Sequence, residues 1–295
     1  MAIAQQELHQ RAELLSANLP PLMVAAERVA ATVAQGVHGR RRVGQGETFW
    51  QYRRYEWGDP IRQVDWRRSA KSDIVYLREN EWEAAQSVWL WCDSSPSMSY
   101  ASARRLQTKA DRAALLTLAL ASLLVRGGEH VAPLGRYMLP TMGRTAVFLL
   151  ATAIGETESK TGGASLPPFE PLPRYGRVVL MSDFMEPLDD IRRAIGLIAD
   201  RGVDGYVLQI LDPSELALPF TGRTRFEGLE KEGAALIGRV EGVREDYSSL
   251  LTRHQQGLRD IARVSGWSYG LHVTEQPAEA ALLRLYTTLG LPRAR

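Results

Sequence analysis

From Ser87 to its C-terminus, the chain alternates between short apolar runs and longer segments that carry apolar residues at helical spacing. The short runs are rich in β-branched and aromatic residues, which is typical of buried strands, and the first run occupies residues 87–92. Strands that alternate with helices form a mostly parallel sheet with helices on both faces. The sequence therefore predicts a doubly wound, Rossmann-type α/β domain over residues 87–295.

The same spacing rules place the remaining elements of this domain. We expect helices at about residues 103–126, 144–154, 188–201, 243–264 and 278–289. We expect further strands at about residues 130–134, 136–139, 177–182, 205–211 and 268–273, and a small hairpin within residues 226–240.

A helical segment begins the chain. Residues 1–35 contain two short patterns of helical spacing separated by prolines, and the second pattern has apolar residues at Leu22, Ala26, Val29 and Val33. Alanine-rich helices of this kind pack on a neighbouring domain or on a partner. We therefore treat residues 1–35 as an N-terminal helical segment.

Residues 36–86 are rich in tryptophan and arginine, and acidic residues interleave with the arginines. Such interleaving favours internal ion pairs and the packing of guanidinium planes on aromatic rings. We therefore expect this segment to pack on the α/β domain, with Trp66 as a buried anchor. Nucleic-acid binding, with rings stacked on bases and arginines on phosphates, is the less favoured interpretation of the same segment.

Two of the predicted strands are each followed by an aspartate, and the first aspartate begins an Asp-x-Ser-x-Ser pattern. The residues concerned are Asp93, Ser95, Ser97 and Asp183. Turn and cap chemistry explains one such loop but not two aspartates at strand ends. Open α/β sheets bind ligands at the carboxyl ends of their strands, and carboxylate and hydroxyl oxygens suit Mg²⁺ or Mn²⁺. The sequence therefore predicts a divalent metal site at this edge of the sheet.

This oxygen set resembles the metal-ion-dependent adhesion site of von Willebrand factor A domains. The resemblance implies a von Willebrand factor A-like fold in which Ser95 and Ser97 bind the ion directly, and Asp93 and Asp183 bind it directly or through water. The family pattern also has a threonine in a middle loop. Here the loop at residues 161–165 lies in the corresponding interval, and either Thr161 or Ser165 supplies the fifth oxygen, or neither does.

The segment before the first strand is similar to the signature of the bacterial family called domain of unknown function 58. Its pattern runs Tyr-Arg-x-Tyr, Gly-Asp, Arg-x-(Ile/Val)-Asp-Trp and Ser-Ala. A later block, which includes Phe226 and Glu230, is also similar to that family, and the match covers most of residues 36–290. This resemblance implies an adaptor or co-chaperone that works with a MoxR-type AAA+ ATPase.

The predicted site lacks an evident catalytic base, because no lysine or histidine completes it in the sequence pattern and a serine nucleophile needs a positioned base. We therefore expect a non-enzymatic, metal-dependent module that binds an acidic side chain of a protein partner. One alternative is a Mg²⁺-dependent hydrolase or phosphotransfer enzyme that uses Asp93. The other is nucleic-acid binding through residues 36–86.

The composition fits a cytoplasmic protein. The only cysteine, Cys92, excludes an internal disulfide, which agrees with a reducing compartment. The N-terminus lacks a secretory signal pattern, and the most apolar run, residues 113–125, is too short to span a bilayer. A formal net charge of +2 does not predict a polyanionic partner.

Overall fold

The computed structural model describes residues 22–34, 49–54, 64–70, 74–80, 86–158, 163–230 and 233–289. The chain divides into two compact units, one formed by His38–Ala85 and one formed by Met1–Val37 together with Gln86–Arg295. In the described part of the chain, no helix has both the length and the apolar character needed to cross a bilayer.

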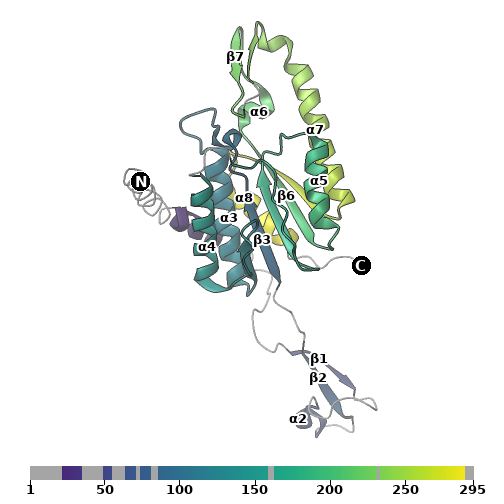
Figure 1. Cartoon of the computed structure of the whole chain (residues 1–295). Helices are drawn as coiled ribbons and strands as arrows, with labels where there is room; N and C mark the ends of the chain where they lie inside the picture. The colour runs from purple at the N-terminus through teal and green to yellow at the C-terminus, as the bar shows by residue number, and fades with distance from the viewer. Residues whose placement is uncertain are drawn as a thin grey trace, which may run out of the picture. The chain divides into compact units, whose positions relative to one another are not determined.

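The larger unit is built on a five-stranded sheet in which all neighbouring strands are parallel (Figure 1). Its strand order is β4-β3-β5-β6-β9. The chain moves from β3 to one side and then returns to add strands on the other side, so the order reverses between β3 and β5. The strands are β3 (Ser87–Cys92), β4 (His130–Pro133), β5 (Arg177–Ser182), β6 (Asp204–Leu211) and β9 (Ser268–Val273).

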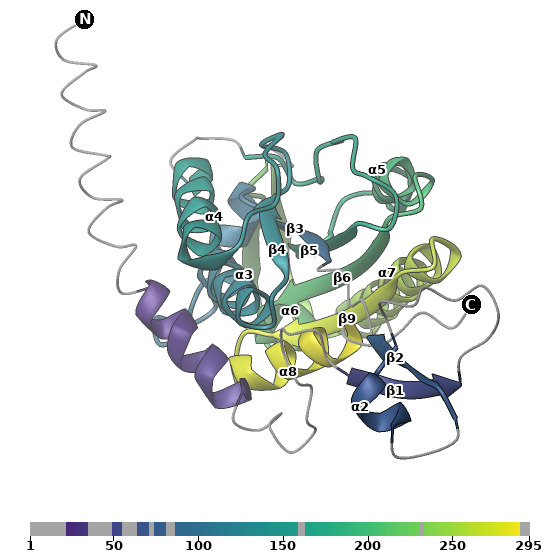
Figure 2. The ribbon, with the colours of Figure 1, turned by 90° about the horizontal axis from the view of Figure 1, so that it is seen from below.

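Helices cover both faces of this sheet (Figure 2). Alternate residues of β3 explain why: Val88 and Leu90 enter one apolar core, whereas Trp89 and Trp91 enter the other. The predicted doubly wound α/β fold is therefore confirmed. The first core is closed by α3 (Lys109–Arg126), α4 (Gly143–Glu158), α8 (Ala278–Leu289) and the helix at residues 22–34, and the second by α5 (Leu188–Ala199) and α7 (Arg244–Val264).

The helix at residues 22–34 is part of the core of the larger unit. Its residues Ala26, Val29, Ala30 and Val33 are buried in the same apolar cluster as α3 and α8. Polar contacts add to this packing, because Glu27 accepts a hydrogen bond from Ser122 and pairs with Arg126, both on α3. The helical spacing predicted for this stretch is confirmed, while the first pattern, before Pro20, lies outside the described residues.

Two predicted elements differ from the structure. The helix expected from residue 103 begins at Lys109, because Thr108 caps it: the Thr108 side chain accepts from the backbone of Asp111 and the Asp111 side chain accepts from the backbone of Thr108. The strand expected at residues 136–139 is not formed: a turn covers residues 134–137, and residues 138–139 have no regular secondary structure. Gly135 and Tyr137 have φ angles of 84° and 51°, which a strand does not accommodate.

Short elements complete the larger unit at the carboxyl edge of the sheet. The predicted hairpin is confirmed as an antiparallel pair of strands that precedes α7. The short elements are η2 (Pro96–Ser99), α6 (Pro213–Ala217), β7 (Thr224–Glu227), β8 (Ala234–Ile237) and η3 (Val240–Gly242).

The smaller unit contains an antiparallel pair, β1 (Phe49–Arg54) with β2 (Tyr76–Asn80), and the one-turn helix α2 (Trp66–Ser69). The Ser69 hydroxyl donates to the Asp65 carbonyl at 2.7 Å and accepts from the Tyr76 amide at 2.9 Å, which ties α2 to β2. The Trp66 side chain is 62% exposed, so the elements of the smaller unit do not bury it. The packing of this segment on the α/β domain stays a prediction.

Candidate metal site

The two predicted aspartates lie side by side at the point where the strand order reverses. In the register of β3 and β5, Cys92 pairs with Met181, and the Asp93 amide donates to the Met181 carbonyl at 2.9 Å. Asp93 is therefore level with Ser182, the last residue of β5, and Asp183 is the next residue along the chain. Such a reversal opens a crevice at the carboxyl edge of a doubly wound sheet, where ligands bind.

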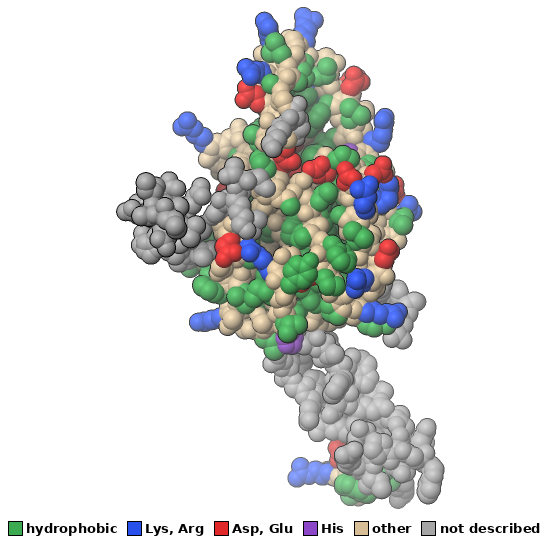
Figure 3. All heavy atoms as spheres, in the orientation of Figure 1, with side chains coloured by type: hydrophobic (Ala, Val, Ile, Leu, Met, Phe, Trp, Pro, Cys, Tyr) green, Lys and Arg blue, Asp and Glu red, His purple; other side chains and the backbone are tan. Residues whose placement is uncertain are grey.

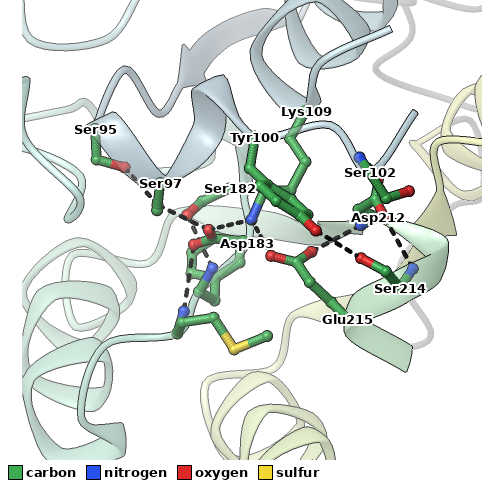
Figure 4. Close-up of polar contacts among 12 residues, drawn as sticks. Ser95, Ser97, Tyr100, Ser102, Lys109, Ser182, Asp183, Asp212, Ser214 and Glu215 are labelled. Carbon is green, nitrogen blue, oxygen red and sulfur yellow. Dashed lines mark hydrogen bonds and ion pairs between the residues drawn. The ribbon is translucent and has the colours of Figure 1, made fainter. Parts of the chain in front are cut away.

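The serine and aspartate oxygens form a continuous row in this crevice (Figure 4). The Ser95 and Ser97 hydroxyl oxygens lie 3.1 Å apart, and the Ser97 hydroxyl donates to Asp183 Oδ2 at 2.8 Å. The pair of serines comes from the start of η2, whose turn folds the Asp-x-Ser-x-Ser loop back over β5. The structure thus brings three of the predicted oxygen donors into direct contact.

Asp93 organises the loop that carries the two serines. Its Oδ1 accepts from the Ser95 amide at 2.7 Å, and its Oδ2 accepts from the Ser182 hydroxyl at 2.5 Å. Burial raises the pKa of Asp93 to about 6, against the lowering effect of the hydrogen bonds from Ser182 and Ser95, and the charge of Asp183 raises it further. Asp93 is therefore a buried carboxylate with both oxygens already engaged. Sequence reasoning missed Ser182, which joins the ends of the two strands.

The backbone beside Asp183 is held in a strained conformation. Phe184 is a fully buried non-glycine residue with a φ of 50°, which costs on the order of 1–3 kcal/mol. Hydrogen bonds fix this turn: the Phe184 amide donates to Ser182 Oγ at 2.9 Å, and His254 Nε2 donates to the Phe184 carbonyl at 2.6 Å. In addition, Gln209 Nε2 donates to the Asp183 carbonyl at 2.8 Å. These contacts aim the Asp183 carboxylate into the crevice.

A lysine lies at the centre of the site, so the prediction that no lysine completes it is wrong. The Lys109 ammonium is 2.8 Å from Asp183 Oδ2 and 2.5 Å from Glu215 Oε1, and its side chain is 1% exposed. Burial opposes the charge of Lys109, but the two carboxylates outweigh that effect and raise its pKa above the usual value. The sequence pattern does not identify Lys109 as a site residue, because it is 74 residues from Asp183 in the sequence and is the first residue of a helix.

The carboxylate partner of Lys109 is positioned by a third strand end. Asp212 follows β6 and caps α6: its Oδ1 accepts from the Ser214 amide at 2.8 Å, and its own amide donates to Glu215 Oε2 at 2.7 Å. Asp212 Oδ2 also accepts from the Ser102 amide at 2.9 Å. The signal in the sequence was the same as for Asp93 and Asp183, because another apolar run ends in an aspartate.

The predicted middle loop lies against the Asp-x-Ser-x-Ser loop. A Cβ atom at Gly163 would lie 2.2 Å from Ser94 Oγ, so this close approach requires glycine. The Ser165 hydroxyl donates to Glu186 Oε1 at 2.5 Å. Thr161 lies outside the described residues. The identity of the fifth oxygen therefore stays a prediction.

The hairpin of β7 and β8 also reaches the site. In the loop between these strands, Glu230 Oε1 accepts from the Ser97 amide at 3.3 Å. On the other side of Asp93, a pocket of about 270 Å³ is lined by β3, β4 and α4 and includes Cys92. The Cys92 sulfur lies 2.7 Å from Thr117 Oγ1 and packs against α3, as expected for a structural cysteine.

The oxygen row fits a small divalent cation. Mg²⁺ holds its ligands at about 2.0–2.1 Å in an octahedron, which places adjacent ligand oxygens about 3 Å apart. The distances from Ser95 Oγ to Ser97 Oγ and from Ser97 Oγ to Asp183 Oδ2, 3.1 and 2.8 Å, match such edges. Among the described residues, no group of three or more histidine, cysteine, aspartate or glutamate side chains is placed to hold a metal. A cation here would therefore rely on hydroxyls and keep open positions.

Fold and site together define the class of the protein: a doubly wound, Rossmann-type α/β domain with an oxygen-lined crevice at the reversal of its strand order. The chain belongs to the family described as "Protein of unknown function DUF58", whose model matches residues 51–257, more than half of the chain. The family resemblance of the signature segment is thereby confirmed.

The chain is similar in sequence to two mycobacterial proteins, and two solved structures from Bacteroides species match it at lower identity. "Uncharacterized protein Rv1480" of Mycobacterium tuberculosis and "Uncharacterized protein Mb1516" of Mycobacterium bovis are each 24% identical over 84% of this chain and 80% of their own length. The crystal structure of the conserved hypothetical protein BatB from Bacteroides thetaiotaomicron is 17% identical, with a TM-score of 0.39 over 70% of this chain and 98% of that one. An aerotolerance-related membrane protein from Bacteroides fragilis is 16% identical, with a TM-score of 0.38 over 69% and 98%.

Proposed function

We propose that this protein is a non-enzymatic interaction module that holds Mg²⁺ or Mn²⁺ in its crevice and binds an acidic side chain of a protein partner through the ion. The observation that carries the proposal is the row formed by Ser95, Ser97 and Asp183, in which two successive oxygen–oxygen distances, 3.1 and 2.8 Å, are close to the edge length of an octahedron around Mg²⁺. When bound, the ion supplies a concentrated positive charge with coordination positions that the protein leaves open.

The residues of the site have separate tasks under this proposal. Ser95, Ser97 and Asp183 present oxygens to the ion. Asp93 fixes the serine loop through the Ser95 amide and adds negative charge, either as a direct ligand or through water. The buried surroundings strengthen the attraction between the ion and the partner's carboxylate, because fewer water molecules screen it than at an open surface.

We further propose that the partner is a MoxR-type AAA+ ATPase and that both proteins work in the bacterial cytoplasm, with this chain as an adaptor or co-chaperone. Support comes from the resemblance of the Trp/Arg-rich signature at residues 51–70 and from membership of the matching family. Nucleic acid is a less suitable partner. Within residues 36–86, the segment to which that alternative applies, acidic residues interleave with the arginines, whereas nucleic-acid sites cluster Lys and Arg. On the face of the larger unit in Figure 3, Lys and Arg side chains are likewise scattered, and several lie beside acidic ones.

The contacts of the site favour binding over turnover. The two oxygens of Asp93 accept hydrogen bonds from the Ser95 amide and the Ser182 hydroxyl, which hold the carboxylate against its own loop and reduce its strength as a nucleophile. Lys109 is held between two carboxylates and has no free electron pair to act as a base while it is charged. A screen of phosphatase and esterase substrates with Mg²⁺ separates the two classes: turnover that Asp93→Ala abolishes would establish the hydrolase instead.

The test of the interaction is capture of the MoxR-type ATPase of the same bacterium by the immobilised full chain. We expect capture in Mg²⁺, loss of capture in EDTA, and loss with Asp93→Ala or Asp183→Ala. Asp189→Ala serves as the matched control. Asp189 lies on α5, its side chain is 83% exposed, and it forms a surface ion pair with Arg192 on the same helix. Equal capture in all these conditions would place the interaction surface elsewhere.

A further inference from the structure

The Lys109 side chain crosses the site from helix to sheet. Lys109 is the first residue of α3, directly after the cap residue Thr108, and its amide donates to the Tyr100 carbonyl at 3.3 Å. From there the buried side chain runs inward and places its ammonium between Asp183, after β5, and Glu215, on α6 (Figure 4). One cation thus joins three elements at the carboxyl edge of the sheet.

The ammonium uses the same oxygen that the proposed ion would use. Asp183 Oδ2 accepts from the Ser97 hydroxyl and from Lys109 Nζ, both at 2.8 Å. A carboxylate oxygen has two lone pairs, and these two donors take both of them. The Ser97 hydroxyl can rotate its proton away and still present its oxygen, but an ammonium carries only donors. When the Ser97 proton turns away, one lone pair of Asp183 Oδ2 is free, but the ammonium 2.8 Å from this oxygen repels a divalent ion that approaches it. Lys109 therefore opposes ion binding at Asp183 for as long as it keeps that contact.

Glu215 is positioned to keep its contact with the ammonium when Lys109 leaves Asp183. Its Oε1 lies 2.5 Å from Lys109 Nζ, and its Oε2 is anchored by the Asp212 amide at 2.7 Å. The Tyr247 hydroxyl donates to the Glu215 carbonyl at 2.5 Å and fixes the backbone of α6. Lys109 can consequently leave Asp183 without becoming a buried charge that lacks a counter-ion, which would be costly.

We propose that Lys109 is the resident counter-cation of Asp183 and competes with the divalent ion for that carboxylate, while Glu215 retains the ammonium in the loaded state. This inference rests on the proposed metal-dependent function. It accounts for the burial of Asp183, which is 3% exposed beside Asp93, because the Lys109 ammonium offsets the repulsion between the two carboxylates. It also sets the affinity: the ion alone binds weakly, and it binds well when the partner's carboxylate adds negative charge.

The test is Mn²⁺ binding to the full chain, measured by electron paramagnetic resonance and calorimetry with MnCl₂ alone. Lys109→Met keeps the length of the side chain and removes its charge, so we expect affinity for Mn²⁺ to rise by about tenfold or more. Glu215→Gln weakens the second anchor and commits the ammonium to Asp183, so we expect affinity to fall. A purely structural role of Lys109 would not move the two affinities in opposite directions.

Thermal unfolding supplies an independent readout. In EDTA, Lys109→Met should have a lower Tm than the wild type, because Asp183 and Glu215 lose their counter-cation, and MnCl₂ should restore much of that loss. If Lys109→Met does not fold, the test is the Mn²⁺ affinity of Glu215→Gln, which should be lower than that of the wild type. Unchanged Mn²⁺ affinity in the folded variants, with a wild type that binds Mn²⁺, overturns the competition alone. Absence of Mn²⁺ binding in the wild type and in both variants overturns the proposed metal site as well.

Discussion

At the scale of single residues, the carboxyl edge of the sheet stores several buried polar groups, and each is satisfied by a specific neighbour. Asp93 depends on Ser182, and Lys109 depends on Asp183 and Glu215. Breaking one member of such a pair leaves the other buried and unpaired, which costs more than the pair contributes. A substitution in the site is therefore expected to change the stability of the domain as well as ion binding, and the two effects need separate measurements.

His272, on β9, shows how burial links stability to pH. It is 2% exposed, with Arg112 Nη1 at 3.3 Å from its Nε2. Burial, Arg112 and Arg284 lower its pKa from 6.5 to about 4. Below pH 6.5 the unfolded chain takes up a proton that the folded chain refuses, so we expect His272 to lower the free energy of unfolding as pH falls towards about 4, by on the order of 3 kcal/mol in total.

Urea unfolding at pH 7.5 and pH 5 checks this prediction. Asp93 has the opposite sign, because its raised pKa makes the folded state bind its proton more readily as pH falls through about 6. The wild type must therefore be compared with His272→Gln, which retains Asp93. We expect a smaller loss of stability between the two pH values in the variant. An identical loss in both proteins would show that His272 does not titrate as proposed.

At the scale of elements, the site is assembled where loops from different strands touch. Gly163 permits one such contact, because a Cβ at this position would lie 2.2 Å from Ser94 Oγ and 2.3 Å from the Ser94 carbonyl oxygen. Gly163→Ala should therefore push the middle loop off the Asp-x-Ser-x-Ser loop and lower the Tm. Gly196→Ala is the control, because Gly196 lies in α5 with no atom within 4 Å of an added Cβ.

The two glycine variants should differ in Tm, with a decrease for Gly163→Ala and no decrease for Gly196→Ala. In a helix, alanine is favoured over glycine by about 1 kcal/mol, so Gly196→Ala should keep or raise the Tm, as measured by differential scanning calorimetry. Gly163→Ala should also reduce the amount of ATPase captured, whereas Gly196→Ala should not. If Gly163→Ala has the Tm and the capture of the wild type, the contact between the two loops is unimportant for the site.

The regular elements were predictable from the sequence because short apolar runs and helical spacing mark them locally. The apolar runs before Asp93, Asp183 and Asp212 mark β3, β5 and β6. Contacts between residues that are far apart in the sequence could not be predicted, because they depend on how the elements pack in three dimensions. Lys109 meets Asp183 only because α3 begins above β5, and no spacing rule reports this. Residues 136–139 were mistaken for a strand because the φ angles of Gly135 and Tyr137 are not visible in composition.

At the scale of the whole molecule, the described charges concentrate where the proposed ion would bind, although the formal net charge of the chain is only +2. Asp93, Asp183, Asp212 and Glu215 lie at one edge of the sheet, and Lys109 pairs with two of them, Asp183 and Glu215. A negative crevice in a nearly neutral molecule attracts a cation locally. The central claim of this account is that such a cation is divalent and is held by the serine row.

Mn²⁺ binding by the wild type and by Asp183→Ala tests this claim most directly, since Mn²⁺ reports its own coordination by electron paramagnetic resonance. We expect one Mn²⁺ ion per wild-type chain, displaced by excess Mg²⁺, and no bound ion in Asp183→Ala. Ser97→Ala should weaken binding in the same assay, and Asp189→Ala should bind as the wild type does. Failure of the wild type to bind Mn²⁺, or equal binding by wild type and Asp183→Ala, would contradict the account.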